Sequence, residues 1–225
     1  KALPAVKKKS IFLWNPLKTH DGKDWKVKRN LDILGKIFNN ISTFDPSDAN
    51  KYSIDLVAQP FFKIEKVDIN KNIDLYFIGS DKGRLNQLIA IKNKAEQEGL
   101  ICHFHITPSK RIEYSEEEKK HLSFTEISYQ ENLILASKAK CLVEIVQENQ
   151  TGPTMRTMEA AFLGCKLLTN RSSAANDIFY HPNNTYIIHG ANQIELKSFI
   201  DSAPVNFEQE INLTHNIKNW WQKFL

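Results

Sequence analysis

The chain has 225 residues, of which 41% are hydrophobic and 25% are charged, with only 8 glycines and 8 prolines. This composition excludes a disordered or low-complexity protein, and the length allows one large domain, or one domain and part of another. No apolar run reaches the roughly 18–20 residues of a membrane-spanning helix. The first residues also lack the pattern of a signal peptide.

The formal net charge of +4 is unevenly distributed along the chain. Residues 1–30 hold nine Lys or Arg residues and two Asp residues, whereas the rest of the chain is slightly acidic. A basic segment of this kind attracts anionic lipid or nucleic acid. It lacks the interleaved aromatic platform of single-strand binders, so we do not expect a nucleic-acid partner. A solvated basic face and an anionic membrane surface both stay open.

Cysteine and histidine residues indicate neither a disulfide framework nor a metal site. Cys102, Cys141 and Cys165 lie far apart in apolar surroundings, and their odd number favours free thiols in a reducing compartment. His103 and His105 alternate along an apolar segment without a third ligand at metal spacing, which favours core or sheet-end positions.

The first sixty residues predict alternating strands and helices. Asp45 and Ser47 are suitable caps for a short helix, and Pro60 interrupts the last apolar run. We expect strands over residues 10–14, 41–44 and 58–62, and helices over 27–38 and 45–52. This stretch gives no sign of being a complete domain.

Residues 63–72 are polar and aperiodic, so we interpret them as a linker, and a second β-α series follows. Residues 107–123 form a charged excursion within that series. Strands are expected over 73–78, 100–106, 141–146, 166–169 and 186–188, and helices over 84–99, 129–139, 153–164, 194–200 and 214–225. Short apolar strands that alternate with helices are typical of a parallel sheet covered on both faces. The fold class is therefore α/β, with a doubly wound domain over 73–205.

In an open parallel sheet, ligands bind outside the carboxyl ends of the strands. The first loop with a suitable composition is 79–84 (GSDKGR), where Gly79 and Gly83 allow a close backbone approach. Lys82 and Arg84 place cations at a helix N-terminus, which a bound phosphate would explain. An exposed basic turn is the alternative. The loop is neither a dinucleotide-binding nor a Walker motif, so neither a nicotinamide cofactor nor ATP hydrolysis is indicated.

The second loop runs from Val146 into a helix that carries Arg156 and Glu159. Pro153 stands where a first helical residue is expected, and Thr154 and Arg156 in the first turn suit an anion. Glu159 shares a helix face with Arg156, so a simple ion pair between them is the alternative.

A third loop, 123–132, enters a helix at Tyr129. It could hold a base by stacking and backbone hydrogen bonds. Alternatively, Tyr129 packs as a hydrophobic staple at the start of the helix.

These loops, in this order, resemble the carboxy-terminal half of GT-B glycosyltransferases of group 1, most closely bacterial enzymes of lipopolysaccharide and capsule biosynthesis. The resemblance is carried by residues 74–84, 127–132, 144–160 and 166–170. It covers 73–205 and extends loosely upstream through 12–16 and 43–46. It implies four parts: 1–62, the end of an acceptor-side domain; 63–72, a linker; 73–205, a donor-binding Rossmann-like domain; and 206–225, a helix that packs back on the body. We expect the acceptor side to be truncated in this chain.

The resemblance implies a site for a nucleotide-diphosphate sugar, without a metal or other cofactor. Lys82, Arg84 and Arg156 would stabilise the leaving nucleotide. Glu159 would bind the ribose, Gly152 and Thr154 the diphosphate, and Ile127, Ser128 and Tyr129 the base. Donor contacts would also come from Gly79, Ser80, Glu148 and Gln150.

One position departs from the family pattern. Retaining relatives have Glu-x7-Glu, but the first position is Thr151 here, so retention or inversion of the anomeric configuration is open. The catalytic base is unassigned. His20, Asp21 and Asp24 are candidates on the amino-terminal side, and a solvated loop is the alternative.

The resemblance implies transfer of a sugar to a glycan or glycolipid hydroxyl, in the cytoplasm or at the cytoplasmic face of the inner membrane. Three other classes of protein stay open. A binding module would hold the nucleotide-sugar without turnover, and an epimerase of the same fold would convert the donor without an acceptor. A receiver- or flavodoxin-like domain is disfavoured, because acidic clusters at strand ends are not evident.

Overall fold

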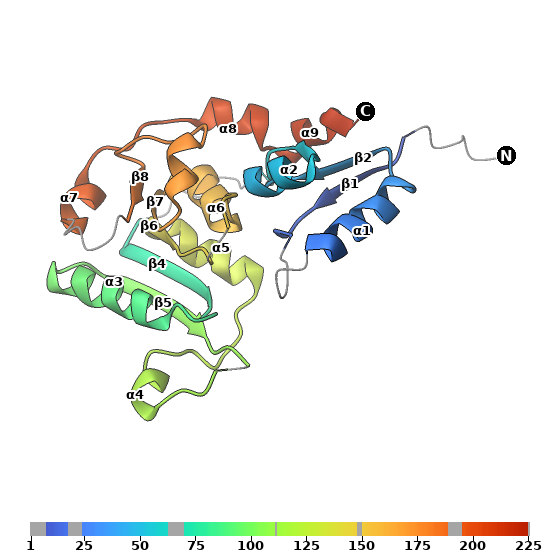
Figure 1. Cartoon of the computed structure of the whole chain (residues 1–225). Coiled ribbons are helices and arrows are strands. Elements are labelled where there is room, and N and C mark those ends of the chain that lie inside the picture. Colours follow the sequence, from blue (N-terminus) through green and yellow to red (C-terminus); the bar gives the residue numbers. More distant parts are fainter. Residues whose placement is uncertain are drawn as a thin grey trace. The chain divides into compact units, whose positions relative to one another are not determined.

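The structure, a computed structural model, describes residues 8–17, 24–62, 70–110, 112–147, 150–188 and 195–224. The chain divides into two compact units (Figure 1). The first unit comprises Lys1–Lys63, Asn149–Pro153 and Asn212–Leu225, and the second comprises Ile64–Glu148 and Thr154–Ile211. Both contain helices and parallel strands, so the α/β fold class is confirmed. The four-part division drawn from the sequence stays a prediction, and most of its linker lies outside the described residues.

The first unit contains a parallel sheet in the order β1-β2-β3. The strands are β1 (Ser10–Leu13), β2 (Asn40–Thr43) and β3 (Asp55–Leu56), and the helices between them are α1 (Asp24–Gly35) and α2 (Pro46–Tyr52). The expected strand over 58–62 is wrong. Pro60 lacks a backbone N–H, and of that stretch only Phe61 forms a bridge, to Asn216.

Asp45 caps α2, as expected. Its Oδ1 accepts hydrogen bonds from the backbone N–H groups of Ser47 (2.9 Å) and Asp48 (3.3 Å). Ser47 lies inside the first turn and is not the cap.

The last expected helix, over 214–225, is broken into pieces. α8 (Glu208–Thr214) is followed by α9 (Ile217–Trp220) and a 3-10 helix, η3 (Trp221–Phe224). The break occurs where the His215 carbonyl accepts a hydrogen bond from Phe61 N (2.7 Å) and Asn216 caps α9 through Lys218 N (3.1 Å). Trp220 then packs edge-on against Phe12, with ring centroids 5.1 Å apart.

The second unit contains five parallel strands in the order β5-β4-β6-β7-β8. They are β4 (Ile73–Ser80), β5 (Cys102–Thr107), β6 (Ala139–Glu144), β7 (Lys166–Thr169) and β8 (Thr185–Ile187), close to the expected ranges. β4 comes first in sequence and lies between β5 and β6, so the chain crosses to opposite sides of β4. Such a switch point is where doubly wound sheets bind ligands, outside the carboxyl ends of the strands.

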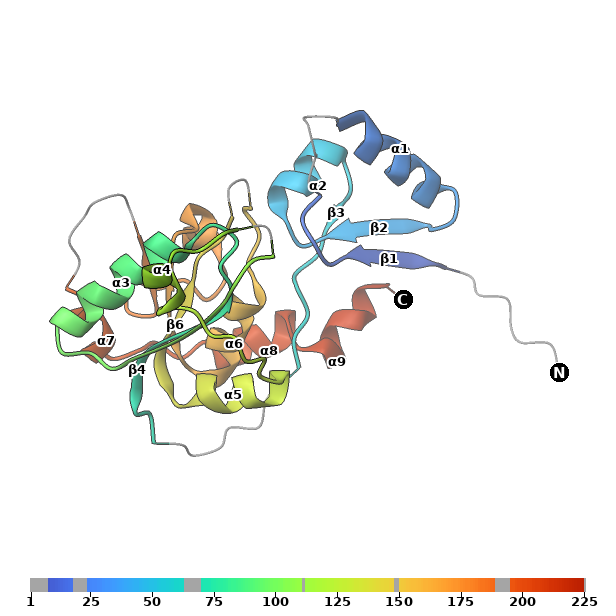
Figure 2. The same ribbon diagram turned by 90° about the horizontal axis from the view of Figure 1, so that it is seen from below.

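Helices cover both faces of this sheet (Figure 2). The sheet connections contain α3 (Leu85–Gln97), α4 (Glu116–Lys119), α5 (Tyr129–Ser137), α6 (Met155–Leu163) and η2 (Ser172–Asn176), and α7 (Leu196–Asp201) follows β8. Leu88 of α3 and Phe199 of α7 pack in one cluster with Leu75. The next β4 residue, Tyr76, faces the opposite cluster with Ala136 of α5. This alternation along β4 separates the two apolar layers.

The start of α6 differs from expectation. Thr154 has an extended backbone and its Oγ1 accepts from Arg156 N (3.0 Å), so Thr154 is the N-cap and the helix begins at Met155. Pro153 therefore precedes the helix.

Candidate active site

Arg84 joins the carboxyl ends of β4 and β6 at the switch point. Its Nε donates to the Asp81 carbonyl (2.9 Å), its Nη2 to the Ser80 carbonyl (2.5 Å) and its Nη1 to the Ile145 carbonyl. Its guanidinium carbon lies 5.5 Å from the centre of the Phe77 ring, and burial lowers the pKa of Arg84. These contacts make Arg84 a positioning residue for both loops, and its expected contact with a leaving group stays a prediction.

The N-terminus of α3 is filled by a carboxylate of the chain itself. Asp81 is 1% exposed, and its Oδ1 accepts from the backbone N–H groups of Arg84 (2.7 Å) and Leu85 (2.6 Å). Its Oδ2 accepts from the Tyr114 hydroxyl (2.8 Å). The amides that the sequence offered to a phosphate are therefore already bound.

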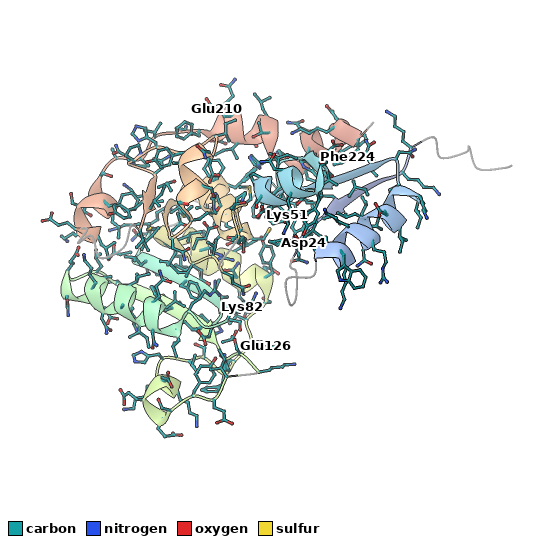
Figure 3. The ribbon with its side chains drawn as sticks, in the orientation of Figure 1. Asp24, Lys51, Lys82, Glu126, Glu210 and Phe224 are labelled. Carbon is teal, nitrogen blue, oxygen red and sulfur yellow. The ribbon has the colours of Figure 1, made fainter. Side chains whose placement is uncertain are left out.

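The turn between β4 and α3 requires a left-handed backbone at two successive residues, Lys82 (φ +48°) and Gly83 (φ +82°). The backbone N–H of Lys82 donates to Ser109 Oγ (2.8 Å), which lies 3.2 Å from Ser80 Oγ. A Cβ on Gly79 would lie 3.4 Å from the Phe77 ring. Figure 3 shows the exposed side chain of Lys82 at the carboxyl end of β4.

Glu144 ends β6 and is buried beneath the start of α6. Its Oε1 accepts from Thr154 N (3.0 Å), Thr154 Oγ1 (2.6 Å) and Thr157 Oγ1 (2.6 Å). Its Oε2 accepts from Thr169 Oγ1 (2.7 Å) and Arg171 Nε (3.3 Å). Burial alone would raise the pKa of Glu144, but Arg171 and the three hydroxyl groups outweigh it and lower that pKa. Thr154, assigned to the diphosphate, thus binds Glu144.

Arg171 extends this network beneath the sheet edge. Its Nη2 donates to Asp177 Oδ2 (2.5 Å) and its Nη1 to Asp177 Oδ1 (3.1 Å). Glu144, Arg171 and Asp177 were missed in the sequence. One signal was present: Glu144 is a charged residue at the end of an apolar, buried strand, where a charge needs a partner.

A second buried network holds Arg156 and Glu159 on α6. Arg156 Nη2 donates to Glu159 Oε1 (3.0 Å), and Nη1 pairs with Oε2. Asn132 bridges the pair, because its Nδ2 donates to Glu159 Oε1 (3.2 Å) and its Oδ1 accepts from Arg156 Nη1 (3.1 Å) and from the Tyr76 hydroxyl (3.1 Å). The Glu159 side chain is 0% exposed and that of Arg156 is 14% exposed. The ion pair that was the alternative interpretation is present.

Burial shifts the proton affinities of this network. It raises the pKa of Glu159, although Arg156 opposes that shift, and it raises the pKa of Tyr76 to about 12. Tyr129, the first residue of α5, is half-exposed. The contact of Tyr129 with a base stays a prediction.

Ser128 caps α5. Its Oγ accepts from Glu131 N (3.2 Å), and its backbone N–H donates to the Glu131 carboxylate (2.7 Å). Ile127 before it is half-buried. The expected base contacts of Ile127 and Ser128 stay predictions.

Residues 150–153 precede α6 in the chain and belong to the first unit. Two of them, Thr151 and Gly152, bind Asp45. Asp45 Oδ2 accepts from Thr151 N (3.0 Å) and Gly152 N (2.8 Å), and Oδ1 accepts from Thr151 Oγ1 (2.6 Å). A Cβ on Gly152 would lie 2.8 Å from the Phe44 ring, so this close approach requires glycine. Gln150 Nε2 donates to the Gly152 carbonyl (3.4 Å). Glu148 lies outside the described residues.

Of the three candidates for a catalytic base, only Asp24 lies within the described residues. Asp24 is paired with Lys51 at 2.9 Å, and the two side chains point toward one another in Figure 3. His20 and Asp21 lie outside the described residues.

The described part of the chain contains neither a metal-binding cluster nor a membrane-spanning helix. It holds no group of three or more His, Cys, Asp or Glu side chains that could bind a metal ion. His105 is buried, and its Nε2 lies 2.9 Å from the Thr125 carbonyl oxygen. Among the described helices, none has the length and apolar character needed to span a bilayer.

The sequence matches no family model and no curated protein. The solved structure of the glycosyltransferase TarM matches 86% of this chain and 42% of its own, at 10% identity and a TM-score of 0.52. A mutant of S. aureus TarM in complex with fondaparinux, alpha-GlcNAc-glycerol and UDP matches 92% of this chain and 46% of its own, at 10% identity and a TM-score of 0.52. A glycosyltransferase of kitacinnamycin matches 81% and 55%, at 10% identity and a TM-score of 0.42.

At this identity the likeness to TarM shows the fold, which is that of GT-B glycosyltransferases. The chain spans less than half the length of the TarM structures.

Proposed function

We propose that this chain is the donor-binding part of a glycosyltransferase, which moves a sugar from a nucleotide-diphosphate sugar to a hydroxyl of a glycan. The GT-B fold supports the reaction class, and the UDP in the TarM complex supports the class of donor. The proposal extends to surface polysaccharide, lipopolysaccharide or capsule, as the acceptor, and to the cytoplasm or the cytoplasmic face of the inner membrane as the location. Sequence resemblance alone supports those extensions.

The observation that carries the proposal is the Arg156–Glu159 pair near the start of α6, the helix that follows the switch point, in which Glu159 is fully buried and Arg156 partly exposed. An arginine binds phosphate oxygens in bidentate geometry, and a carboxylate accepts hydrogen bonds from vicinal ribose hydroxyls. The two side chains that a nucleotide diphosphate needs are therefore adjacent. In the structure the two side chains form an ion pair with each other.

Donor binding exchanges these partners. The diphosphate replaces the Glu159 carboxylate as the partner of Arg156, and the released carboxylate accepts the ribose hydroxyls. Lys82 at the end of β4 adds a second cation outside the sheet edge. Because negative charge grows on the leaving nucleotide as the glycosidic bond breaks, Arg156 and Lys82 act mainly in the transition state.

The test is calorimetry of the full chain with UDP-, GDP-, CMP- and TDP-sugars, followed by an assay of nucleotide release with glycan acceptors. Arg156→Ala should lower kcat about 10²-fold or more. Glu159→Gln should mainly weaken donor binding. Lys120→Ala, an exposed cation paired with Glu117, is the matched control and should change neither quantity.

An Arg156→Ala enzyme with an unchanged kcat would contradict the role of Arg156. Donor binding without acceptor-dependent nucleotide release would favour a binding module. Conversion of the donor without any acceptor would favour an epimerase.

A further inference from the structure

One face of α1 carries large apolar side chains into solvent. Trp25 is 55% exposed and Ile33 is 49% exposed. They stand eight residues apart with Arg29 midway, so they lie along one stripe about 12 Å long. We call Trp25, Lys26, Arg29 and Ile33 the α1 outer face.

The opposite face of α1 already supplies the contacts that hold the helix. Val27 and Leu34 are half-buried and Leu31 is buried, at the i, i+4, i+7 spacing of a core-facing stripe. The exposed Trp25 and Ile33 are therefore additional to the residues that pack the helix against the body of the unit.

The α1 outer face is also cationic. The charged groups of Arg29 and Lys26 lie 5.5 Å and 5.8 Å from the centre of the Trp25 ring, so they flank its indole. Lys28 and Lys36 are exposed on the same segment. Of the acidic residues of α1, Asp24 is paired with Lys51, which leaves Asp32 as the other carboxylate.

We propose that the α1 outer face binds the surface of an anionic lipid bilayer. A tryptophan and an aliphatic side chain flanked by cations match the layered chemistry of a membrane interface, where the ring and the isoleucine enter the acyl boundary and the cations meet the phosphates. A nucleic-acid backbone would satisfy Lys26 and Arg29 and leave Ile33 in water. The inference does not depend on glycosyl transfer.

The test is flotation of the full chain with phosphatidylcholine vesicles that contain or lack phosphatidylglycerol. The chain should float with the anionic vesicles, and salt should weaken this binding. Arg29→Glu changes the surface charge by two and should weaken binding roughly 25-fold, since each charge contributes about fivefold. Trp25→Ala should weaken it about tenfold. Both residues are exposed, and circular dichroism of each variant should match that of the parent.

Trp221→Ala and Lys218→Glu are the matched controls. Both residues are exposed, and both lie in the α9–η3 segment. Figures 1 and 2 both show β1 and β2 between α1 and α9. The controls should bind anionic vesicles as the parent does. Equal binding to neutral vesicles, unchanged binding of Arg29→Glu and Trp25→Ala, or binding to duplex DNA without binding to vesicles would overturn the proposal.

Discussion

The loops after β4 and β6 were expected to present open helix N-termini to a phosphate. The first is closed by a carboxylate, and the second by the Thr154 hydroxyl group, which is itself held by a carboxylate. In the first loop the carboxylate is Asp81, three residues before the N–H group of Arg84 that it binds. In the second it is Glu144, which lies 10 residues before Thr154 and is paired with the buried Arg171. The first closure is local, whereas the second depends on residues brought together by the sheet.

The difference indicates how each loop can meet an anion. Backbone amides of α3 would have to leave Asp81, whereas the cations near the two loops can act through their side chains. Lys82 is exposed, and Arg156 is partly exposed. A diphosphate that is bound by these side chains leaves the hydrogen bonds of Asp81 and of Glu144 in place. Three predictions concern how much individual carboxylates near these loops contribute to the stability of the fold.

Loss of Glu144, the carboxylate below the start of α6, should have the largest effect on the free energy of unfolding. Glu144→Ala leaves the Arg171 charge buried with Asp177 alone and removes the acceptor of three hydroxyl groups, so it should lower the free energy of unfolding by about 3–5 kcal/mol. Urea denaturation measures this change.

A double-mutant cycle with Arg171→Met is the control for Glu144. The two substitutions remove the same ion pair, so their effects should fall short of additivity by about 1–3 kcal/mol. Additive effects would show that Glu144 and Arg171 do not act as a pair.

Loss of Asp81, the carboxylate at the start of α3, should have a smaller effect on the free energy of unfolding. Asp81→Ala removes the acceptor for two amides of α3, and its expected cost is about 1–2 kcal/mol. Hydrogen exchange should accelerate at Arg84 and Leu85 and leave β6 unchanged. Asp32→Ala, an exposed aspartate of α1, is the control and should leave these rates unaltered. Equal acceleration in both variants would contradict a capping role for Asp81.

The smallest expected effect is on the pH dependence of stability. The pKa of Glu144 is lowered, whereas the pKa of Glu159 is raised. The pKa of Glu159 is raised above its ordinary value of 4.5, so the folded state binds the proton more tightly than the unfolded state. Its contribution to stability must therefore fall as the pH rises above about 4.5. Relative to Glu159→Gln, the parent should therefore lose stability as the pH rises through this window. A pH-independent difference between the two proteins would contradict the raised pKa.

The pattern of apolar residues predicted most of the fold, because each strand and each helix depends on the residues of its own short stretch of sequence. A continuous apolar run located β4, and Asp45 located the start of α2. The strand expected over 58–62 was wrong because an apolar run can pair by a single bridge, as Phe61 does.

The candidate site was less predictable, for a physical reason. Spacing on one helix revealed the Arg156–Glu159 pair. The partners of Glu144 lie up to 27 residues away, on another helix and after another strand, so only the sheet order reveals them. The sequence predicted Asp81 only as a residue of a loop, because its position in the chain does not show that its carboxylate accepts hydrogen bonds from the backbone at the start of α3.

The discontinuous make-up of the first unit affects how the protein folds during synthesis. The strands β1, β2 and β3 are synthesised before the segments that they contact. Asp45 can form its hydrogen bonds only once Thr151 and Gly152 have been synthesised, and Phe61 can form its bridge only once Asn216 has been synthesised. Apart from the inserted 149–153 segment, the second unit is one uninterrupted stretch that ends at Ile211. Vectorial synthesis normally lets the amino-terminal domain fold first. Here the β1-β2-β3 unit completes its contacts only after residues 149–153 and 212–225 have been synthesised, because Asp45 and Phe61 bind there.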